Sequence, residues 1–140
     1  MFFVGQKTRY LRPKTIIPMK ILYTILLLLV SNVFMTFAWY GNLKLQQMKL
    51  INDWPLILII LASWGVALIE YCFSIPANRI GSEMNGGPMN MIQLKVIQEV
   101  ISLTVFTVIA VTVFKTETFK INHIISFLFL ILAVYFAFKK

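Results

Sequence analysis

The chain has 140 residues, of which 59% are hydrophobic and only 13% are charged, and its formal net charge is +8. Soluble domains usually contain about 25% charged residues, so this composition excludes an ordinary water-soluble globule. The basic residues flank the apolar runs instead of forming one stripe, which argues against a nucleic-acid partner.

Four apolar runs are long enough to cross a lipid bilayer as helices, which takes about 17–25 residues each. We expect the spans at Ile21–Tyr40, at Pro55–Ile75, from about Ile92 to Phe114, and at Ile121–Phe138. Aromatic residues stand near several of their ends, where amphipathic rings favour the headgroup region. The sequence therefore predicts an all-α polytopic membrane protein, a bundle of four transmembrane helices, with the lipid bilayer as its main partner.

The remaining segments are short. Residues 1–18 form a basic N-terminal extension before the membrane domain at 19–140, and Met19 is a plausible alternative start. The connection Pro76–Met91 contains two groups of helix breakers, PANRIG and NGGP. The connection Lys115–Lys120 is so short that the third and fourth helices should be antiparallel neighbours.

The distribution of lysine and arginine predicts the orientation of the spans. One side of the membrane would carry nine of these residues: Lys7, Arg9, Arg12, Lys14, Lys20, Arg79, Lys95, Lys139 and Lys140. The other side would carry four: Lys44, Lys49, Lys115 and Lys120. The positive-inside rule then predicts that both termini are cytoplasmic. A start at Met19 would remove four of the nine, and the near balance would allow insertion in both orientations.

Two carboxylates lie inside the predicted spans, Glu70 in the second and Glu99 in the third. An ionisable residue at the centre of a transmembrane helix costs about 2.5–3.5 kcal/mol on insertion scales. Such residues therefore usually have a function or a local partner. Both carboxylates are expected at similar depth, in the cytoplasmic half of the membrane.

Helical spacing predicts which side chains accompany them. In the second helix, Glu70 shares a face with Ser63, Ala67 and Ser74. In the third helix, one face contains Lys95, Glu99, Ser102 and Phe106, and Gln98 lies beside it. In the first helix, one side contains Thr24, Ser31, Asn32 and Thr36. Lipid cannot satisfy polar groups, so we expect these three faces to point inward and to meet in one polar core.

Two interpretations of this core remain open. In the first, Glu70 and Glu99 bind a cation or exchange protons, since two nearby carboxylates repel each other when both are ionised. In the second, Lys95 neutralises Glu99 one turn away, and Arg79 reaches back to Glu70 or to a lipid phosphate.

The sequence contains no pattern that argues for a metal, a cofactor or an enzyme. His123 is the only histidine and belongs to no Cys/His/Asp cluster, so an interfacial position is expected for it. Phosphate-binding loops, HExxH and nucleophile-elbow motifs do not occur.

Three segments carry a resemblance to a known family. SNVFMTFAWYGNLK (Ser31–Lys44), IEYCFSIPANRIG (Ile69–Gly81) and IQLKVIQEVISLTVF (Ile92–Phe106) resemble a small family of four-helix bacterial membrane proteins that is grouped with the drug/metabolite transporter (DMT) superfamily. The resemblance covers about Met19 to Lys140. It implies a protein of the bacterial inner membrane, classed as a transporter by kinship.

A looser analogy leads to the small multidrug resistance (SMR) transporters, which also have four helices and work as dimers with a membrane-embedded glutamate. Their glutamate lies in the first helix, whereas the acids of this chain lie in the second and third.

The leading hypothesis is a homodimeric transporter subunit that moves a small polar or cationic solute coupled to protons. The alternative is a non-transporting membrane adaptor whose polar core only packs the helices. A third is lipid handling, with Arg79 and Lys95 holding an anionic headgroup.

Overall fold

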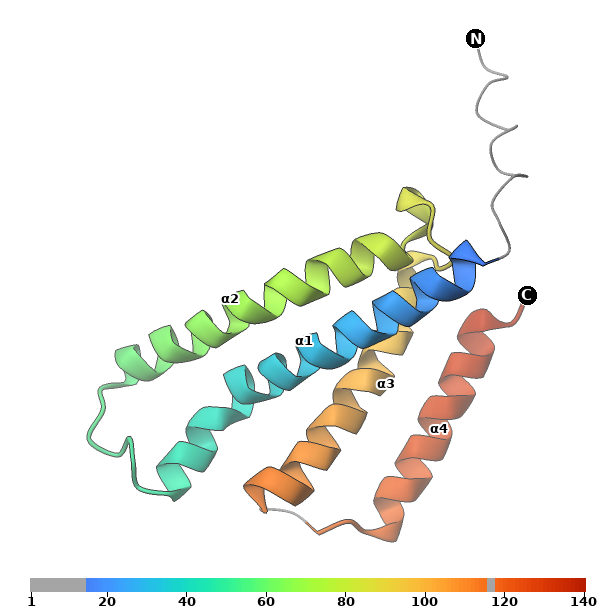
Figure 1. Ribbon diagram of the computed structural model, residues 1–140. Helices are drawn as coiled ribbons and strands as arrows, with labels where there is room; N and C mark the ends of the chain where they lie inside the picture. Colours follow the sequence, from blue (N-terminus) through green and yellow to red (C-terminus); the bar gives the residue numbers. More distant parts are fainter. Residues whose placement is uncertain (1–14, 116–117) are drawn as a thin grey trace.

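The computed structural model describes residues 15–115 and 118–140, and within them the chain is almost entirely helical. The long helices are α1 (Ile16–Gln47), α2 (Leu56–Gly81), α3 (Met91–Ile109) and α4 (Ile121–Phe138) (Figure 1). A short 3-10 turn, η2 (Glu83–Asn85), follows α2, and a π-helical turn, η3 (Ala110–Phe114), extends α3. The four long helices, with η3 counted as the end of the third, are long and apolar enough to cross a membrane, so the predicted all-α membrane fold is confirmed.

Two helices are longer than the apolar runs that predicted them. α1 has 32 residues and α2 has 26. At 1.5 Å per residue, α1 extends over about 48 Å, well beyond a hydrocarbon core of about 30 Å. Its ends therefore project past the apolar part of a bilayer, and Met19 lies inside the helix. The basic residues Lys7, Arg9, Arg12 and Lys14 lie outside the described part of the chain.

The prediction that PANRIG ends the second helix is wrong. α2 continues through Pro76 and ends only at Gly81. A proline removes one backbone N–H from the helix, and neighbouring groups in a transmembrane helix readily compensate for this loss. The connection between α2 and α3 is consequently shorter than predicted and contains only the second group of breakers.

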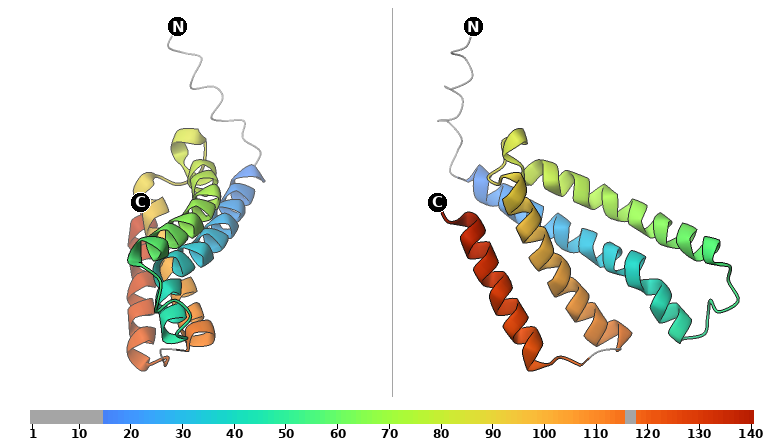
Figure 2. Two further views of the ribbon diagram at one scale, coloured as in Figure 1. Left: turned by 90° about the vertical axis from the view of Figure 1, so that its left-hand side faces the viewer. Right: turned by 180° about the vertical axis from the view of Figure 1, so that it is seen from behind.

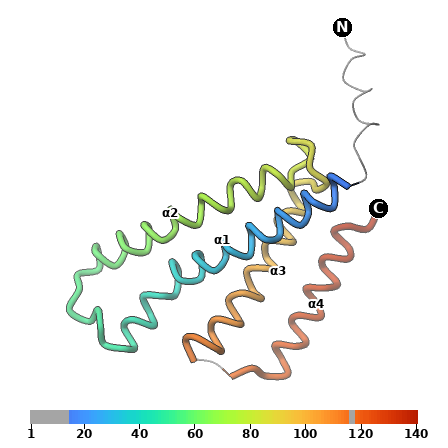
Figure 3. Tube along the Cα trace, viewed as in Figure 1, coloured from blue at the N-terminus to red at the C-terminus, as the bar shows by residue number. Residues whose placement is uncertain are grey.

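The helices lie side by side in the order α2, α1, α3, α4 (Figures 1 and 2). α1 packs against both α2 and α3, and α3 packs against α4 as the short connection predicted. The trace shows α2 and α4 at the two outer positions, with the start of α1 and the end of α4 at the same end of the molecule (Figure 3). The described residues thus form an open row of helices.

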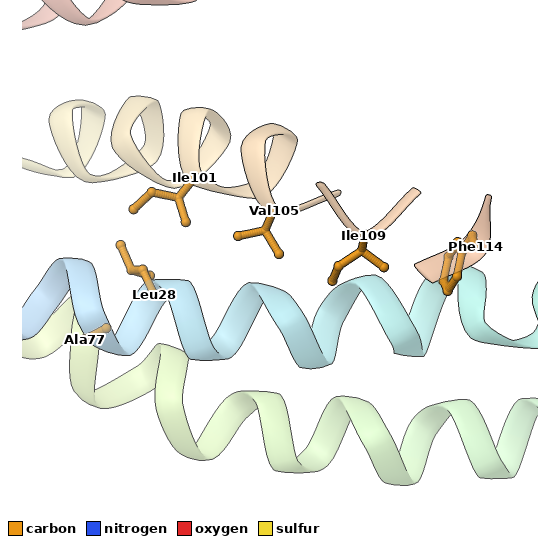
Figure 4. Packing of buried hydrophobic residues seen from close by; sticks show 6 residues of the cluster. All are labelled: Leu28, Ala77, Ile101, Val105, Ile109 and Phe114. Carbon is orange, nitrogen blue, oxygen red and sulfur yellow. The ribbon is translucent and has the colours of Figure 1, made fainter. Parts of the chain in front are cut away.

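The apolar core lies on both sides of α1. Leu28 of α1 stands between Ala77 of α2 and the α3 side, and the cluster continues along α3 and η3 (Figure 4). Its members are Leu28, Ala77, Ile101, Val105, Ile109 and Phe114. No described residue of α4 is buried, so this helix is covered by lipid or by another protein chain.

A compact connection joins α2 to α3. Glu83 N–H donates to the Met89 carbonyl at 2.8 Å, and Met89 N–H donates to the Gly81 carbonyl at 3.0 Å. Gly87 packs so closely that an added Cβ would lie 2.4 Å from the Gly81 carbonyl oxygen. From α1, the Lys20 ammonium donates to the Gly86 carbonyl at 3.0 Å and fastens this connection to the first helix.

A second lysine links α1 to the end of η3, at the opposite end of the molecule. The Lys44 ammonium of α1 donates to the Phe114 carbonyl at 2.7 Å, where η3 ends and the backbone turns to a positive φ of 54° at Lys115. The last carbonyls of a helix have no partner within it, and a lysine satisfies one of them here.

Candidate functional site

The predicted polar faces of the first two helices meet. Every buried polar side chain in the described part of the chain lies on α1 or α2: Thr24, Ser31, Asn32, Thr36, Glu70 and Ser74. The buried face of α2 follows a regular helical spacing through Glu70, Ser74, Ala77 and Gly81. The prediction of inward-pointing polar faces is therefore confirmed for these six side chains, whereas Ser63 and Ala67 of the predicted second face are only half-buried.

Glu70 is the centre of this cluster. Only 2% of its surface is exposed, and the Ser31 hydroxyl donates to its Oε1 atom at 2.6 Å. Its other oxygen, Oε2, is buried and accepts no hydrogen bond from the residues that the structure describes. Close by, the rings of Phe34 and Phe73 stack across the same interface with their centroids 5.7 Å apart. A carboxylate is thus held between two helices with a single donor.

The other polar groups of α1 do not reach Glu70. The side chains of Thr24, Asn32 and Thr36 donate to carbonyls of their own helix, at 2.8 Å in each case. Such bonds to the carbonyl four residues earlier satisfy a hydroxyl or amide without a partner on another helix. Among the described polar residues of α1, only Ser31 bonds across the interface to α2.

Because α2 continues to Gly81, Glu70 lies near the middle of the helix and not one and a half turns from its end, as the shorter predicted span implied. About 21 Å of helix precede it and about 17 Å follow it.

The predicted third face does not join the polar core, and this expectation is wrong. Lys95 and Glu99 form an ion pair with each other, with side chains 68% and 57% exposed. Gln98 and Ser102 are half-buried. The side of α3 that packs on the core is apolar, with Leu94, Ile101, Val105 and Ile109 buried.

Glu99 stays outside the polar core because its charge is neutralised within its own helix. An acid and a base one turn apart on a helix neutralise each other, so neither group needs to be buried. The second interpretation of Glu99, pairing with Lys95, is the one found. Arg79 does not contact Glu70, whose one hydrogen-bond partner is Ser31, but lines a separate pocket at the end of α2.

An apolar cavity of about 270 Å³ lies between α1 and α2 on the side of their connection. Phe37, Trp54, Val66 and Phe114 contribute to its lining, and Ser63 brings a hydroxyl to it. Ser63 lies two turns before Glu70 on the same face of α2, a distance of about 10 Å along the helix axis. The cavity thus borders the face that carries the buried carboxylate.

Sequence reasoning missed two features of this site. It treated Ala77 and Gly81 as part of a loop, although their spacing continues the face of Glu70. It also did not single out Ser31 among the polar residues of α1. The helical spacing through PANRIG could have revealed the first, whereas the second depends on how the two helices are aligned.

His123 lies in the first turn of α4, and its Nδ1 atom accepts a hydrogen bond from the Lys120 N–H at 2.9 Å. The described residues contain no group of three or more His, Cys, Asp and Glu side chains that could hold a metal ion.

Comparison with known proteins places the chain in a family. No curated protein and no solved structure matches it. Residues 24–138 match the model of one family, whose description is "Putative member of DMT superfamily (DUF486)". This match covers most of the chain, with α2, α3 and α4 in full and α1 from residue 24 onward. The chain therefore belongs to this family of the DMT superfamily.

Proposed function

We propose that this protein is one subunit of a small membrane transporter in which Glu70 exchanges a proton for a small polar or cationic solute. The observation that carries the proposal is the state of the Glu70 carboxylate, which is buried with one donor and one unpartnered oxygen. If a buried carboxylate served only to hold the fold together, we would expect both of its oxygens to accept hydrogen bonds.

The physical argument concerns charge in a membrane. A carboxylate removed from water is stable when a proton, a cation or several donors compensate its charge. Ser31 supplies one donor, and the other oxygen remains available to a proton or to a positively charged group. Exchange between these two occupants is the step that couples solute movement to protons.

The proposal assigns this step to Glu70 and not to Glu99. Glu99 is exposed and already paired with Lys95, so a proton or solute would have to compete with a covalently attached ammonium group. Glu99→Gln is therefore a suitable comparison for Glu70→Gln, because both changes remove one carboxylate charge from a transmembrane helix.

A pathway across the membrane requires more than one subunit. The described helices form an open row with α2 and α4 at the outer positions, and such a row does not enclose a channel (Figure 2). We therefore propose a homodimer in the inner membrane, with both termini cytoplasmic. Subunits that stay monomeric in lipid nanodiscs would contradict the dimer, and a C-terminal reporter active only outside the cytoplasm would contradict the orientation.

The test follows protons, because exchange of one proton for a monovalent cation moves no net charge. Wild-type protein is reconstituted in liposomes that enclose a pH-sensitive dye, and a panel of small amines and polar metabolites is added outside, with and without a proton gradient. We expect at least one solute to raise the internal pH faster than it does in protein-free liposomes. Glu70→Gln should abolish this difference, whereas Glu99→Gln should retain it. Equal proton movement in wild type and Glu70→Gln, in equally folded samples, would disprove the proposal.

One observation favours a second candidate, a non-transporting membrane adaptor. Most buried hydroxyl and amide groups of α1 are satisfied by their own helix, as in a cluster that only fills space. An adaptor predicts that no solute of the panel moves protons across the liposome membrane, and that Glu70→Gln changes only the stability of the α1–α2 pair.

A further inference from the structure

A second pocket, of about 370 Å³, lies between the end of α2 and the first turn of α3. Its polar residues are Asn78 and Arg79 from the end of α2 and Ser82 and Asn85 from the connection. These four polar residues come from one short stretch of the chain, residues 78–85, and all of them line the pocket. The pocket is separate from the cluster around Glu70, which lies on the face toward α1.

The remaining wall is apolar. It consists of Ile75 and Met91, both exposed, and of the buried Leu94. In a bilayer, exposed aliphatic side chains of a spanning helix contact lipid tails. The pocket therefore has a mainly apolar lining that continues onto the lipid-facing surface, with a smaller polar part.

The depth of the pocket follows from the chain. Ile75 is the last residue of the apolar run of α2, and Arg79 lies one turn further, about 6 Å along the axis. A guanidinium at this distance from the apolar run lies at the level of the lipid headgroups.

Arg79 is also available to an anion. It is exposed, and in residues 15–115 and 118–140 the one ion pair joins Lys95 to Glu99. Lys95, one turn beyond Met91 on α3, is thus already neutralised. The positive charge of the pocket comes from Arg79, whose planar guanidinium suits two parallel hydrogen bonds to a phosphate.

We propose that this pocket binds the anionic headgroup of a membrane phospholipid. Arg79 holds the phosphate, while Asn78, Ser82 and Asn85 face the polar part of the headgroup. An acyl chain follows Ile75 and Met91 toward the bilayer interior. The charge of the guanidinium and the adjoining apolar wall together favour a lipid over a soluble anion. This inference does not depend on the transport proposal.

Native mass spectrometry of the full chain tests it, with phosphatidylglycerol compared against phosphatidylcholine. We expect wild type to retain phosphatidylglycerol preferentially, and Arg79→Gln to weaken its binding by about ten-fold or more, as expected for loss of a charge-assisted contact. Lys139→Gln is the matched control, because it removes the same charge from the same end of the molecule, and it should leave binding unchanged. Equal losses in both variants, or no loss in Arg79→Gln, would overturn the proposal.

Two further measurements separate a lipid from a free anion and from misfolding. Ile75→Ser should weaken lipid binding, and millimolar glycerol 3-phosphate should not displace the lipid. Displacement by glycerol 3-phosphate with the same dependence on Arg79 would identify a soluble-anion site and overturn the proposal. Arg79→Lys keeps the positive charge and should bind phosphatidylglycerol more tightly than Arg79→Gln but less tightly than wild type. This partial recovery shows that the loss of binding in Arg79→Gln is not a folding defect.

Discussion

Replacing Ser31 with alanine tests the contact on which the candidate site depends. Ser31 is fully buried, and within residues 15–115 and 118–140 its hydroxyl is the only donor to the Glu70 carboxylate. In soluble proteins a hydrogen bond to a charged group contributes about 1.5–3 kcal/mol. Between transmembrane helices the measured contributions average about 0.6 kcal/mol and reach about 1.7 kcal/mol. The membrane values apply here, because α1 and α2 separate into lipid and not into water.

Two features of the contact decide where in that range it falls. The bond is short, at 2.6 Å, and the described part of the chain offers the carboxylate no second donor to replace the first. Against this, a serine freed from Glu70 could bond a carbonyl of its own helix, as Thr24 and Thr36 do. We therefore expect Ser31→Ala to lower the free energy of unfolding by about 1–1.7 kcal/mol.

A double-mutant cycle isolates the bond. Unfolding of Ser31→Ala, Glu70→Met and the double variant is followed by far-UV circular dichroism during titration of mixed micelles with dodecyl sulfate. Methionine removes the acceptor at similar volume, so Ser31→Ala should then cost less than about 0.3 kcal/mol, the usual limit of additivity. Ser63→Ala, a half-buried hydroxyl on the same face of α2, is the control and should be nearly neutral. A coupling energy below about 0.3 kcal/mol would refute the reasoning.

Three further predictions concern other parts of the molecule. Gly87→Ala should sharply lower the melting temperature, because the new Cβ would lie 2.4 Å from backbone atoms of Gly81. Gly65→Ala is the control, and it should be neutral or stabilising because the space around Gly65 is open. Thermal melting followed by circular dichroism compares the two variants. Lys44→Met should speed hydrogen exchange at the end of α3, since the Phe114 carbonyl loses its donor; unchanged exchange there would contradict this role. Glu99→Gln should change the free energy of unfolding by less than about 0.5 kcal/mol in the same micelle titration, because its ion pair is exposed, and a larger loss would indicate an undetected partner.

How far the site could be predicted differs from helix to helix. Helical spacing correctly predicted that Glu70 and Ser74 share a buried face with polar residues of α1 opposite. The same reasoning failed for Glu99, because spacing shows which residues share a face but not what that face packs against. A lysine one turn away removed the need for burial.

Helix ends were predicted less well than helix cores. Pro76 and Gly81 are breakers in water, and the sequence therefore indicated a loop from Pro76 onward. Within a long apolar helix the lost hydrogen bond at Pro76 does not end the helix. The helix ends at Gly81, whose carbonyl lies against Gly87.

The sequence by itself determined the environment of this protein and the number of its spans, because hydrophobic length and sparse charge leave lipid as the only suitable surroundings for four helices. Tertiary structure alone decided that Ser31 donates to Glu70, that one carboxylate oxygen has no partner, and that Arg79 lines a pocket of its own. These contacts depend on which helices are neighbours and how they are aligned, and periodicity along one helix carries no information about either.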